Sequence, residues 1–352
     1  MNILFIIFGI LFFNLIVFFH EFGHFFTAKT FGVKVNEFAL GMGPRVFKFK
    51  KGDTIFSLRA LPLGGFCAME GEDEASSNPN AFGTKAAGKR FIITAAGAVM
   101  NFILGLLMML FIVSQKSALY TTKIEKFSSE TVSSNYGLMV GDEILSIDNH
   151  SILDNRDLSF ELLAYKKNQF DFKVKRNGEI IELKNVTFNT KTNENGKTSL
   201  ILNFSLATEE KTFGNVLKHT WTETVSTVKI AWSSLSGIVT GRFSMKDMSG
   251  PIGTFTAISE AANEGLKTSI FVAFMNIMAL MAFITINLGV FNLLPLPGLD
   301  GGHLVFLLFE MITGKKLNSK YEGFIQILGL VLFVALIIYV SYADILRLLG
   351  KS

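Results

Sequence analysis

Residues 1–24 read MNILFIIFGILFFNLIVFFHEFGH, an apolar run that closes on the pattern His-Glu-Phe-Gly-His. Met1–Phe19 carries no charge and approaches the roughly 20 residues that a helix needs to cross a bilayer. The run has no basic head, and no small-residue cleavage site follows it. We therefore predict a retained membrane span rather than a cleaved signal peptide.

Three further uncharged runs have spanning length: Phe91–Gln115, Thr268–Leu299 and Gly323–Ala343. Composition agrees, because 49% of the residues are hydrophobic and only 18% are charged. The net charge of +4 is small and scattered, which excludes a nucleic-acid partner. A single cysteine, Cys67, excludes an internal disulfide framework and a cysteine-based zinc site. The sequence predicts a polytopic α-helical membrane protein with four transmembrane helices.

Lysine and arginine in the short loops predict the orientation. Ten of them lie between Lys29 and Arg90, and Lys315, Lys316 and Lys320 lie between the last two spans. The N-terminus has none, and the C-terminal tail has only Arg347 and Lys351. By the positive-inside rule both loops are cytoplasmic and both termini are extracytoplasmic. The insert after the second span then lies outside the cell.

That insert, residues 117–208, predicts a soluble α/β domain. Strands are expected at Glu143–Ile147, Phe170–Lys175 and Glu179–Leu183, with a hairpin turn at Arg176-Asn177-Gly178 and a helix at Asp157–Tyr165. The segment Gly137–Asn149 resembles a PDZ domain, a fold that binds peptides by adding a strand to a sheet edge. A structural spacer of similar pattern is the alternative.

Two further patterns flank this domain. Arg45–Lys50, the turn Lys51-Gly52-Asp53 and Thr54–Arg59 alternate as a hairpin, which we expect to associate with the membrane and to capture an unwound polypeptide segment along one edge. A purely structural hairpin is the alternative. After the domain, an apolar stripe predicts a helix that packs against the protein, or else lies on the membrane surface; its residues are Phe213, Val216, Leu217, Trp221, Val225, Val228, Trp232 and Leu235.

His20 and His24 stand one helical turn apart, so both imidazoles can hold one metal ion while Glu21 takes a proton from water. Ionisable groups in an apolar span are costly to bury and usually mark a functional site. Polar residues that merely join helices by hydrogen bonds are the alternative. The sequence favours catalytic zinc, which needs a third protein ligand.

Residues 292–303, NLLPLPGLDGGH, supply that ligand at the end of the third span. Spans one and three run in the same direction, so their C-terminal ends reach the same side of the membrane. Prolines and glycines must break the helix here, which is tolerated only inside protein or beside a water-filled cavity. Asp300 is the only acid in the segment. His303 is a second candidate, although a carboxylate balances the zinc charge better.

These residues resemble the site-2 metalloproteases, in particular the bacterial RseP-type members with an external PDZ domain. The family's HExxH corresponds to His20–His24, and its NxxPxPxLDG corresponds to residues 292–301 at every fixed position. Gly41–Pro44 and Ser249–Gly253 resemble two further family segments. In Gly97–Asn101 an alanine, Ala98, stands where relatives often have proline, a departure that touches helix geometry rather than chemistry.

The resemblance implies Zn²⁺ as cofactor, His20, His24 and Asp300 as metal ligands, Glu21 as catalytic base and Asn292 near the substrate. It implies substrates that are single-span membrane proteins already trimmed outside, such as anti-sigma factors, or remnant signal peptides. A catalytically idle PDZ-bearing scaffold and a metal transporter are the competing hypotheses, and the intact HExxH pattern argues against both.

The domain organisation expected from these patterns has four parts. Residues 1–116 hold the first two spans, the HExxH pattern and the cytoplasmic hairpin, and residues 117–208 form the PDZ-like domain. Residues 209–266 form an amphipathic helix and a linker. Residues 267–352 hold the last two spans and the Leu-Asp-Gly pattern.

Overall fold

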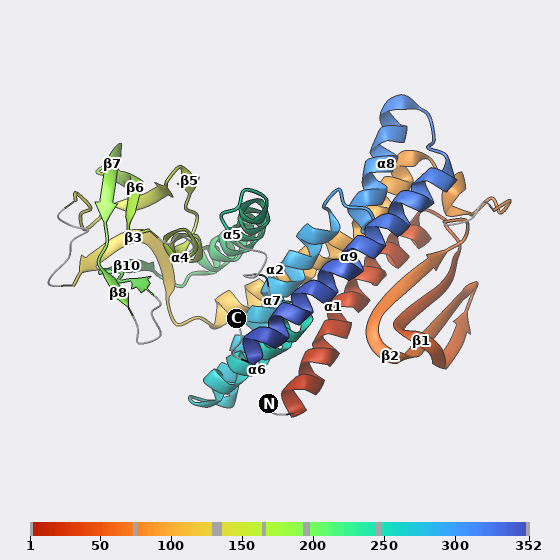
Figure 1. The fold of residues 1–352 in the computed structure, drawn as a ribbon, viewed down its shortest axis with the longest axis horizontal. Coiled ribbons are helices and arrows are strands. Elements are labelled where there is room, and N and C mark those ends of the chain that lie inside the picture. Colours follow the sequence, from red (N-terminus) through yellow and green to blue (C-terminus); the bar gives the residue numbers. More distant parts are fainter. Residues whose placement is uncertain are drawn as a thin grey trace. The chain divides into compact units, whose positions relative to one another are not determined.

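The chain folds into two compact units in a computed structural model that describes residues 3–72, 76–128, 136–163, 167–192, 198–243, 248 and 250–349 (Figure 1). One unit comprises Met1–Met108 and Phe243–Ser352, and the other comprises Met109–Arg242. Within these described ranges, four helices are long and apolar enough to cross a membrane: α1 (Ile3–Thr30), α2 (Ala87–Gln115), α7 (Ile270–Asn292) and α9 (Ser319–Leu348). The four apolar helices of spanning length are thus confirmed.

Helix α1 is longer than the predicted span. It continues to Thr30 because Phe22, Phe25 and Ala28 prolong the apolar pattern beyond the histidines. The HExxH residues therefore lie within the helix, not at its end as predicted, and the candidate span is Gly9–Thr30. The predicted beginning at Met1 lies outside the described residues.

The third uncharged run, Thr268–Leu299, is broken within residues 292–303, as its prolines and glycines predict. Helix α7 ends at Asn292, and because prolines cannot continue a helix, a turn leads to a separate helix α8 (Asp300–Thr313). Before α7, the region predicted as linker contains helix α6 (Pro251–Leu266).

Helix α6 is held to the last span by a buried carboxylate. Asp344 of α9 is 2% exposed, and its Oδ2 accepts hydrogen bonds from the backbone N–H groups of Gly250 (2.9 Å) and Gly253 (2.7 Å) at the α6 N-terminus. A negative charge is favourable at that end of a helix. This contact gives the Gly250–Gly253 part of the predicted family segment a structural role; Ser249 lies outside the described residues.

Between α1 and α2 the chain forms an antiparallel pair, β1 (Val35–Lys51) and β2 (Thr54–Met69), followed by a short 3₁₀ helix η1 (Phe82–Thr84). The predicted turn is present, with Gly52 at φ 59°. The strands are longer than predicted and bend, so that residues 35–40 pair with residues 55–58 on one side and residues 65–69 on the other. The hairpin is thus a small folded sheet with residues 65–69 along one edge.

A buried acid joins the strands of this sheet. Glu37 is 7% exposed and accepts hydrogen bonds from Arg45 (3.1 Å), Ser57 (2.6 Å) and Arg59 (2.9 Å). The Arg45 hydrogen bond, with smaller help from Ser57 and Arg59, holds the pKa of Glu37 at about 2. The acid is therefore ionised at neutral pH, and its charge is matched locally.

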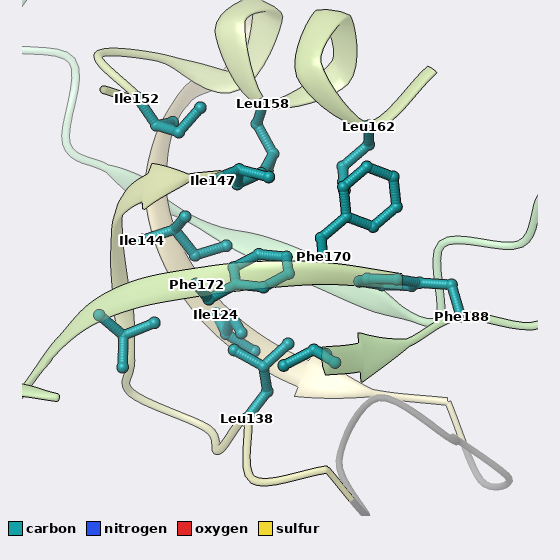
Figure 2. Close-up of a cluster of buried hydrophobic side chains, with 12 residues drawn as sticks. Ile124, Leu138, Ile144, Ile147, Ile152, Leu158, Leu162, Phe170, Phe172 and Phe188 are labelled. Atoms are coloured by element: carbon teal, nitrogen blue, oxygen red, sulfur yellow. The ribbon is translucent and has the colours of Figure 1, made fainter. Parts of the chain in front are cut away.

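The second unit contains an antiparallel sheet with the strand order β10-β3-β4-β6-β7, in which β5 also pairs with β4. The strands are β3 (Leu119–Phe127), β4 (Glu143–Ile147), β5 (His150–Ser151), β6 (Gln169–Arg176), β7 (Glu179–Thr187) and β10 (Phe204–Glu209), with a separate pair β8 (Thr190–Thr192) and β9 (Thr198–Leu200). Figure 2 shows the apolar core between this sheet and helix α4 (Asn155–Leu163), including Ile144, Leu162 and Phe172.

The three predicted strands of the insert are confirmed, with β4 matching residue for residue. The predicted turn between β6 and β7 places Asn177 at φ 51° and Gly178 at φ 91°, the left-handed backbone that an Asn-Gly hairpin turn requires. The predicted helix is α4, and its expected end at Tyr165 lies outside the described residues.

Helix α5 (Phe213–Val239) is the predicted helix after the sheet, but its apolar stripe does not pack as expected. Trp221 is 63% exposed, Trp232 is 59% exposed and Phe213 is 78% exposed. The buried side is instead mostly polar, including His219, Glu223, Ser226 and Thr227. The stripe therefore packs only in part: Val216 is buried, and Val225, Val228 and Leu235 are partly buried. Hydrogen bonds and ion pairs fix the opposite side of the helix.

Candidate metal centre

His20, His24 and Asp300 converge within the helical unit. The Nε2 atoms of His20 and His24 are 3.4 Å apart, and each lies 3.4 Å from Oδ2 of Asp300. Among the described residues, these are the only three ligand-type side chains whose donor atoms gather within 4.8 Å of one another. Residues almost 280 positions apart in the chain thus meet, as the direction of the spans predicts.

The broken helix after α7 brings Asp300 to this point. Leu293 closes α7, and Gly298 adopts φ 89°, a left-handed conformation that favours glycine. A Cβ atom at Gly301 would lie 1.9 Å from the carbonyl oxygen of Leu294. The chain can therefore fold back tightly enough for Asp300 to start α8 beside α1 only because residue 301 has no side chain.

Two further glycines let α1 and α2 approach at the histidines. A Cβ atom at Gly23 would lie 2.3 Å from the carbonyl oxygen of Ala96, and one at Gly97 would lie 2.2 Å from Nε2 of His24 and 2.7 Å from Cε1 of His20. Contacts below 3.0 Å essentially never occur for real Cβ atoms. The two imidazole rings therefore occupy the space that a side chain at residue 97 would fill.

The second nitrogen of each imidazole contacts a polar group. Nδ1–H of His24 donates to the carbonyl oxygen of Ile93 at 2.9 Å. Because a carbonyl can only accept, this contact puts the proton on Nδ1 and leaves the lone pair of Nε2 directed at the cluster. His20 has two carboxamides beside it: the nitrogen of Asn101 lies 3.1 Å from Nδ1 and that of Asn292 lies 3.4 Å from it.

Asn101 is a neighbour of the cluster that the sequence did not assign to the site. It is 0% exposed, and its Oδ1 is buried without a hydrogen-bond partner. Rotating the carboxamide by half a turn would let Oδ1 accept from Nδ1–H of His20. The signal available in the sequence was a lone asparagine inside an apolar run, which is costly to bury and therefore suspect.

His303 lies away from the cluster. Its Nδ1 is 3.4 Å from Oε1 of Glu322, and this ion-pair geometry raises the pKa of His303 above its ordinary value. Of the two candidates for the third ligand, only Asp300 has its oxygen beside the histidine nitrogens.

A cavity of about 1020 Å³ opens at the cluster. His20, Glu21, His24 and Asp300 lie on its wall together with residues 66–69 of strand β2. The ion pair between Arg90 and Glu310, which joins α2 to α8, also lines the cavity. Burial raises the pKa of the Cys67 thiol, so that this cysteine is protonated at neutral pH.

Comparison with known proteins identifies the family. The family model of peptidase family M50 matches residues 8–336. The chain belongs to peptidase family M50. This M50 chain is 36% identical over 340 residues to a Clostridium acetobutylicum protein whose name describes it as a zinc metalloprotease, and the match covers 97% of each chain.

Two further relatives carry more specific names. The M50 chain is 29% identical over 423 residues to the regulator of sigma-W protease RasP of Bacillus subtilis, covering 96% of this chain and 97% of the relative. It is 28% identical over 416 residues to the zinc metalloprotease RasP of Shouchella clausii, with 96% and 97% covered. The M50 chain is accordingly a multi-pass membrane protein and a zinc metalloprotease.

The cluster fits the cofactor of the family. Zinc bonds nitrogen and carboxylate oxygen at 2.0–2.2 Å, and two ligands of a tetrahedral site are then about 3.3–3.6 Å apart. All three separations between the donor atoms in this M50 chain are 3.4 Å. Asp300 Oδ2 is buried without a hydrogen-bond partner, so its lone pairs are available to bind a cation. Two imidazoles and one carboxylate form a donor set found in catalytic zinc sites.

Proposed function

We propose that the chain cleaves peptide bonds within or near the transmembrane segments of single-span membrane proteins. His20, His24 and Asp300 would hold the zinc ion, and Glu21 would act as the catalytic base. The observation that carries the proposal is the 3.4 Å spacing of the three donor atoms at the wall of a cavity that Glu21 shares.

The zinc ion, when bound, supplies Lewis-acid chemistry that lowers the pKa of water to about 7 and polarises the scissile carbonyl. The carboxylate of Glu21 takes a proton from the attacking water and passes it to the nitrogen of the leaving amide. The carbonyl of Ile93 holds the His24 ring in the required tautomer through the 2.9 Å hydrogen bond. Asn292, beside His20, would contact the substrate near the scissile bond.

The substrate would bind as an added strand along residues 65–69. A transmembrane helix hides its carbonyl groups in hydrogen bonds and must be unwound before cleavage. In the described part of the chain, residues 65–69 pair only with β1, and residues 66–69 line the cavity. A Cβ atom at Gly65 would lie 3.3 Å from Cγ of Glu21. This edge, rather than the predicted one at residues 45–59, would hold an extended peptide beside the base.

The substrate class follows from the relatives and the topology. One relative is named a regulator of sigma-W protease, which favours an anti-sigma factor or a remnant signal peptide as substrate of this chain. The basic residues of the two loops favour a cytoplasmic side for both, with extracytoplasmic termini. The hairpin β1–β2 exposes Val46, Phe47 and Phe49, which supports its association with the membrane.

Residues 117–208 would form an extracytoplasmic PDZ-like domain. It would be followed by the helix and linker of residues 209–266, while residues 1–116 and 267–352 would form the membrane-embedded protease. The loop 137–141 has the support that a peptide-binding loop needs: Gly137 and Gly141 adopt φ 103° and 94°, and Arg176 donates to the Gly137 carbonyl at 2.6 Å. Such a domain would exclude substrates whose outer part has not yet been trimmed.

The test uses the purified full chain in lipid vesicles with a single-span model substrate. Glu21→Gln should retain stoichiometric zinc and lose about 10²- to 10⁴-fold in cleavage rate, the range that a general base contributes. The matched control is Glu322→Gln, which removes another carboxylate from the same cavity and should cut within a few-fold of the unaltered chain. Near-normal turnover of Glu21→Gln would overturn the assignment.

A further inference from the structure

Helix α5 exposes its apolar face and buries its polar face, the opposite of a helix on the surface of a soluble domain. Its outer face consists of the exposed apolar residues Phe213, Leu217, Trp221, Trp232 and Val239, of which Val239 is 88% exposed. They recur at intervals of four, seven and eleven residues and so share one side of the helix. Exposed apolar surface of this extent normally has a partner.

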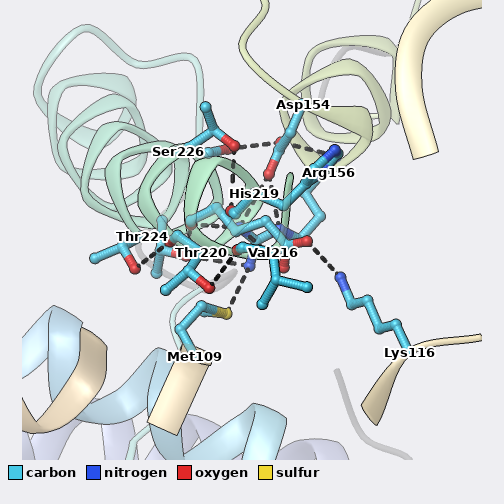
Figure 3. A network of polar contacts seen from close by, with 12 residues as sticks. Met109, Lys116, Asp154, Arg156, Val216, His219, Thr220, Thr224 and Ser226 are labelled. Carbon is cyan, nitrogen blue, oxygen red and sulfur yellow. Dashed lines mark hydrogen bonds and ion pairs between the residues drawn. The ribbon is translucent and has the colours of Figure 1, made fainter. Parts of the chain in front are cut away.

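The inner face is fixed to the sheet domain by charges (Figure 3). Ser226 donates to Oδ1 of Asp154 at 2.9 Å, and Arg156 pairs with Asp154 at 2.9 Å while its Nη1 lies 3.3 Å from the hydroxyl oxygen of Thr227. Lys229 pairs with Asp157 of α4 at 3.1 Å. Buried, mutually satisfied ion pairs of this kind resist rotation, because turning the helix would leave charges buried without partners. The outer face therefore cannot turn inward.

The same contacts place α5 beside the end of a membrane-spanning helix. Helix α2 ends at Gln115, and the next residue, Lys116, pairs with Glu223 in the middle of α5 at 2.5 Å. Arg156, beside Glu223, also reaches the sulfur of Met109 in the last turns of α2 at 4.0 Å. Charged residues that directly follow a span lie in the headgroup layer, so the middle of α5 lies at that depth.

We propose that the outer face of α5 lies in the interfacial layer of the lipid bilayer, with the helix along the membrane surface. Trp221 and Trp232 are eleven residues apart, about 16 Å along the axis, and point to the same side. Both can reach one depth only when the axis runs parallel to the membrane. Tryptophan is the side chain most typical of this layer, and a surface helix buries its apolar face about 5–10 Å deep. The ion pairs to α4 then attach the sheet domain to the membrane surface.

The chain contains only two tryptophans, Trp221 and Trp232, so its tryptophan fluorescence, excited selectively at long wavelength, reports on this face alone. The purified full chain is reconstituted in phosphatidylcholine vesicles, in vesicles of lipid brominated near the headgroups, and in vesicles of lipid brominated near the bilayer midplane. Headgroup-proximal bromine should remove about half or more of the emission, and midplane bromine clearly less, as a shallow helix requires. Trp221→Phe and Trp232→Phe should each show the same order of quenching.

Two exposed positions one turn apart provide matched variants. In the Trp221→Phe background, Val239→Asp places a charge on the outer face and should weaken the lipid quenching of Trp232. Ser236→Asp places the same charge beside that face and should leave it nearly unchanged. Quenching by aqueous iodide in place of lipid bromine would overturn the proposal. Protection of both tryptophans from both quenchers would also overturn it, because another protein surface would then cover the face.

Discussion

Gly97→Ala adds one methyl group to α2 and should disable the metal centre. The new Cβ atom would lie 2.2 Å from Nε2 of His24 and 2.7 Å from Cε1 of His20. To restore an ordinary contact the His24 ring must move by about 1 Å, whereas zinc–ligand distances tolerate only about 0.2 Å. The hydrogen bond from His24 to Ile93 opposes that movement.

The magnitudes separate a damaged site from a damaged fold. Replacing a helical glycine by alanine favours the helix by about 1 kcal/mol, while overpacking costs about 1–3 kcal/mol, so the net change in unfolding free energy is small. A displacement of about 1 Å at a reacting centre costs about 10²-fold in rate. We therefore expect a nearly unchanged melting temperature with substoichiometric zinc and about 10²-fold slower cleavage.

The assay compares metal content, melting temperature and initial cleavage rate of the purified chain in vesicles. The matched control is Gly88→Ala on the same helix, where an added Cβ meets no atom within 4 Å, and it should behave like the unaltered chain. If Gly97→Ala retains stoichiometric zinc and full activity, the close approach of α2 to the two histidines does not constrain the metal centre, and the reasoning fails.

Three further predictions concern single groups. Asp300→Ala should lose both zinc and cleavage while His303→Ala keeps most of each, since only Asp300 has its oxygen among the donor atoms. The zinc content of the two purified variants tests this; zinc retained in Asp300→Ala and lost in His303→Ala would show that Asp300 is not the third ligand. Asn101→Leu should weaken zinc binding about 10- to 100-fold, as loss of a hydrogen-bond partner of a ligating histidine does, whereas Asn101→Asp should keep the zinc affinity of the unaltered chain. If a chelator titration gives the same zinc affinity for the unaltered chain and both variants, Asn101 does not support His20. The pKa of Glu37 is about 2 in the fold and near 4.5 in the unfolded chain, so the ionised carboxylate stabilises the β1–β2 sheet above pH 4.5. This contribution should disappear as the pH falls towards 2. Hydrogen exchange of the sheet amides should show that loss in the unaltered chain and not in a Glu37→Gln variant.

The sequence by itself determined the four apolar helices, strands β4, β6 and β7 of the sheet domain, and the candidate residues of the metal centre. These features are local. A run of uncharged residues with spanning length has one stable form in lipid, and β4 and the Asn177-Gly178 turn follow from alternation and left-handed backbone preference. The spacing of His20 and His24 is a property of one helical turn, and Asp300 was the only acid in a segment that proline must break.

Only the tertiary structure decided which neighbours these residues meet. The places of Gly97 and Asn101 beside the histidines depend on how α2 crosses α1, which no local pattern encodes. The folded-back sheet that brings residues 65–69 to the cavity depends on pairing between distant segments. The stripe on α5 shows the limit most plainly: periodicity revealed an apolar side, but whether it faces protein depends on Asp154, Arg156 and Asp157, which lie about 70 residues earlier. Periodicity locates a face along a helix, whereas long-range ion pairs decide the direction in which that face points.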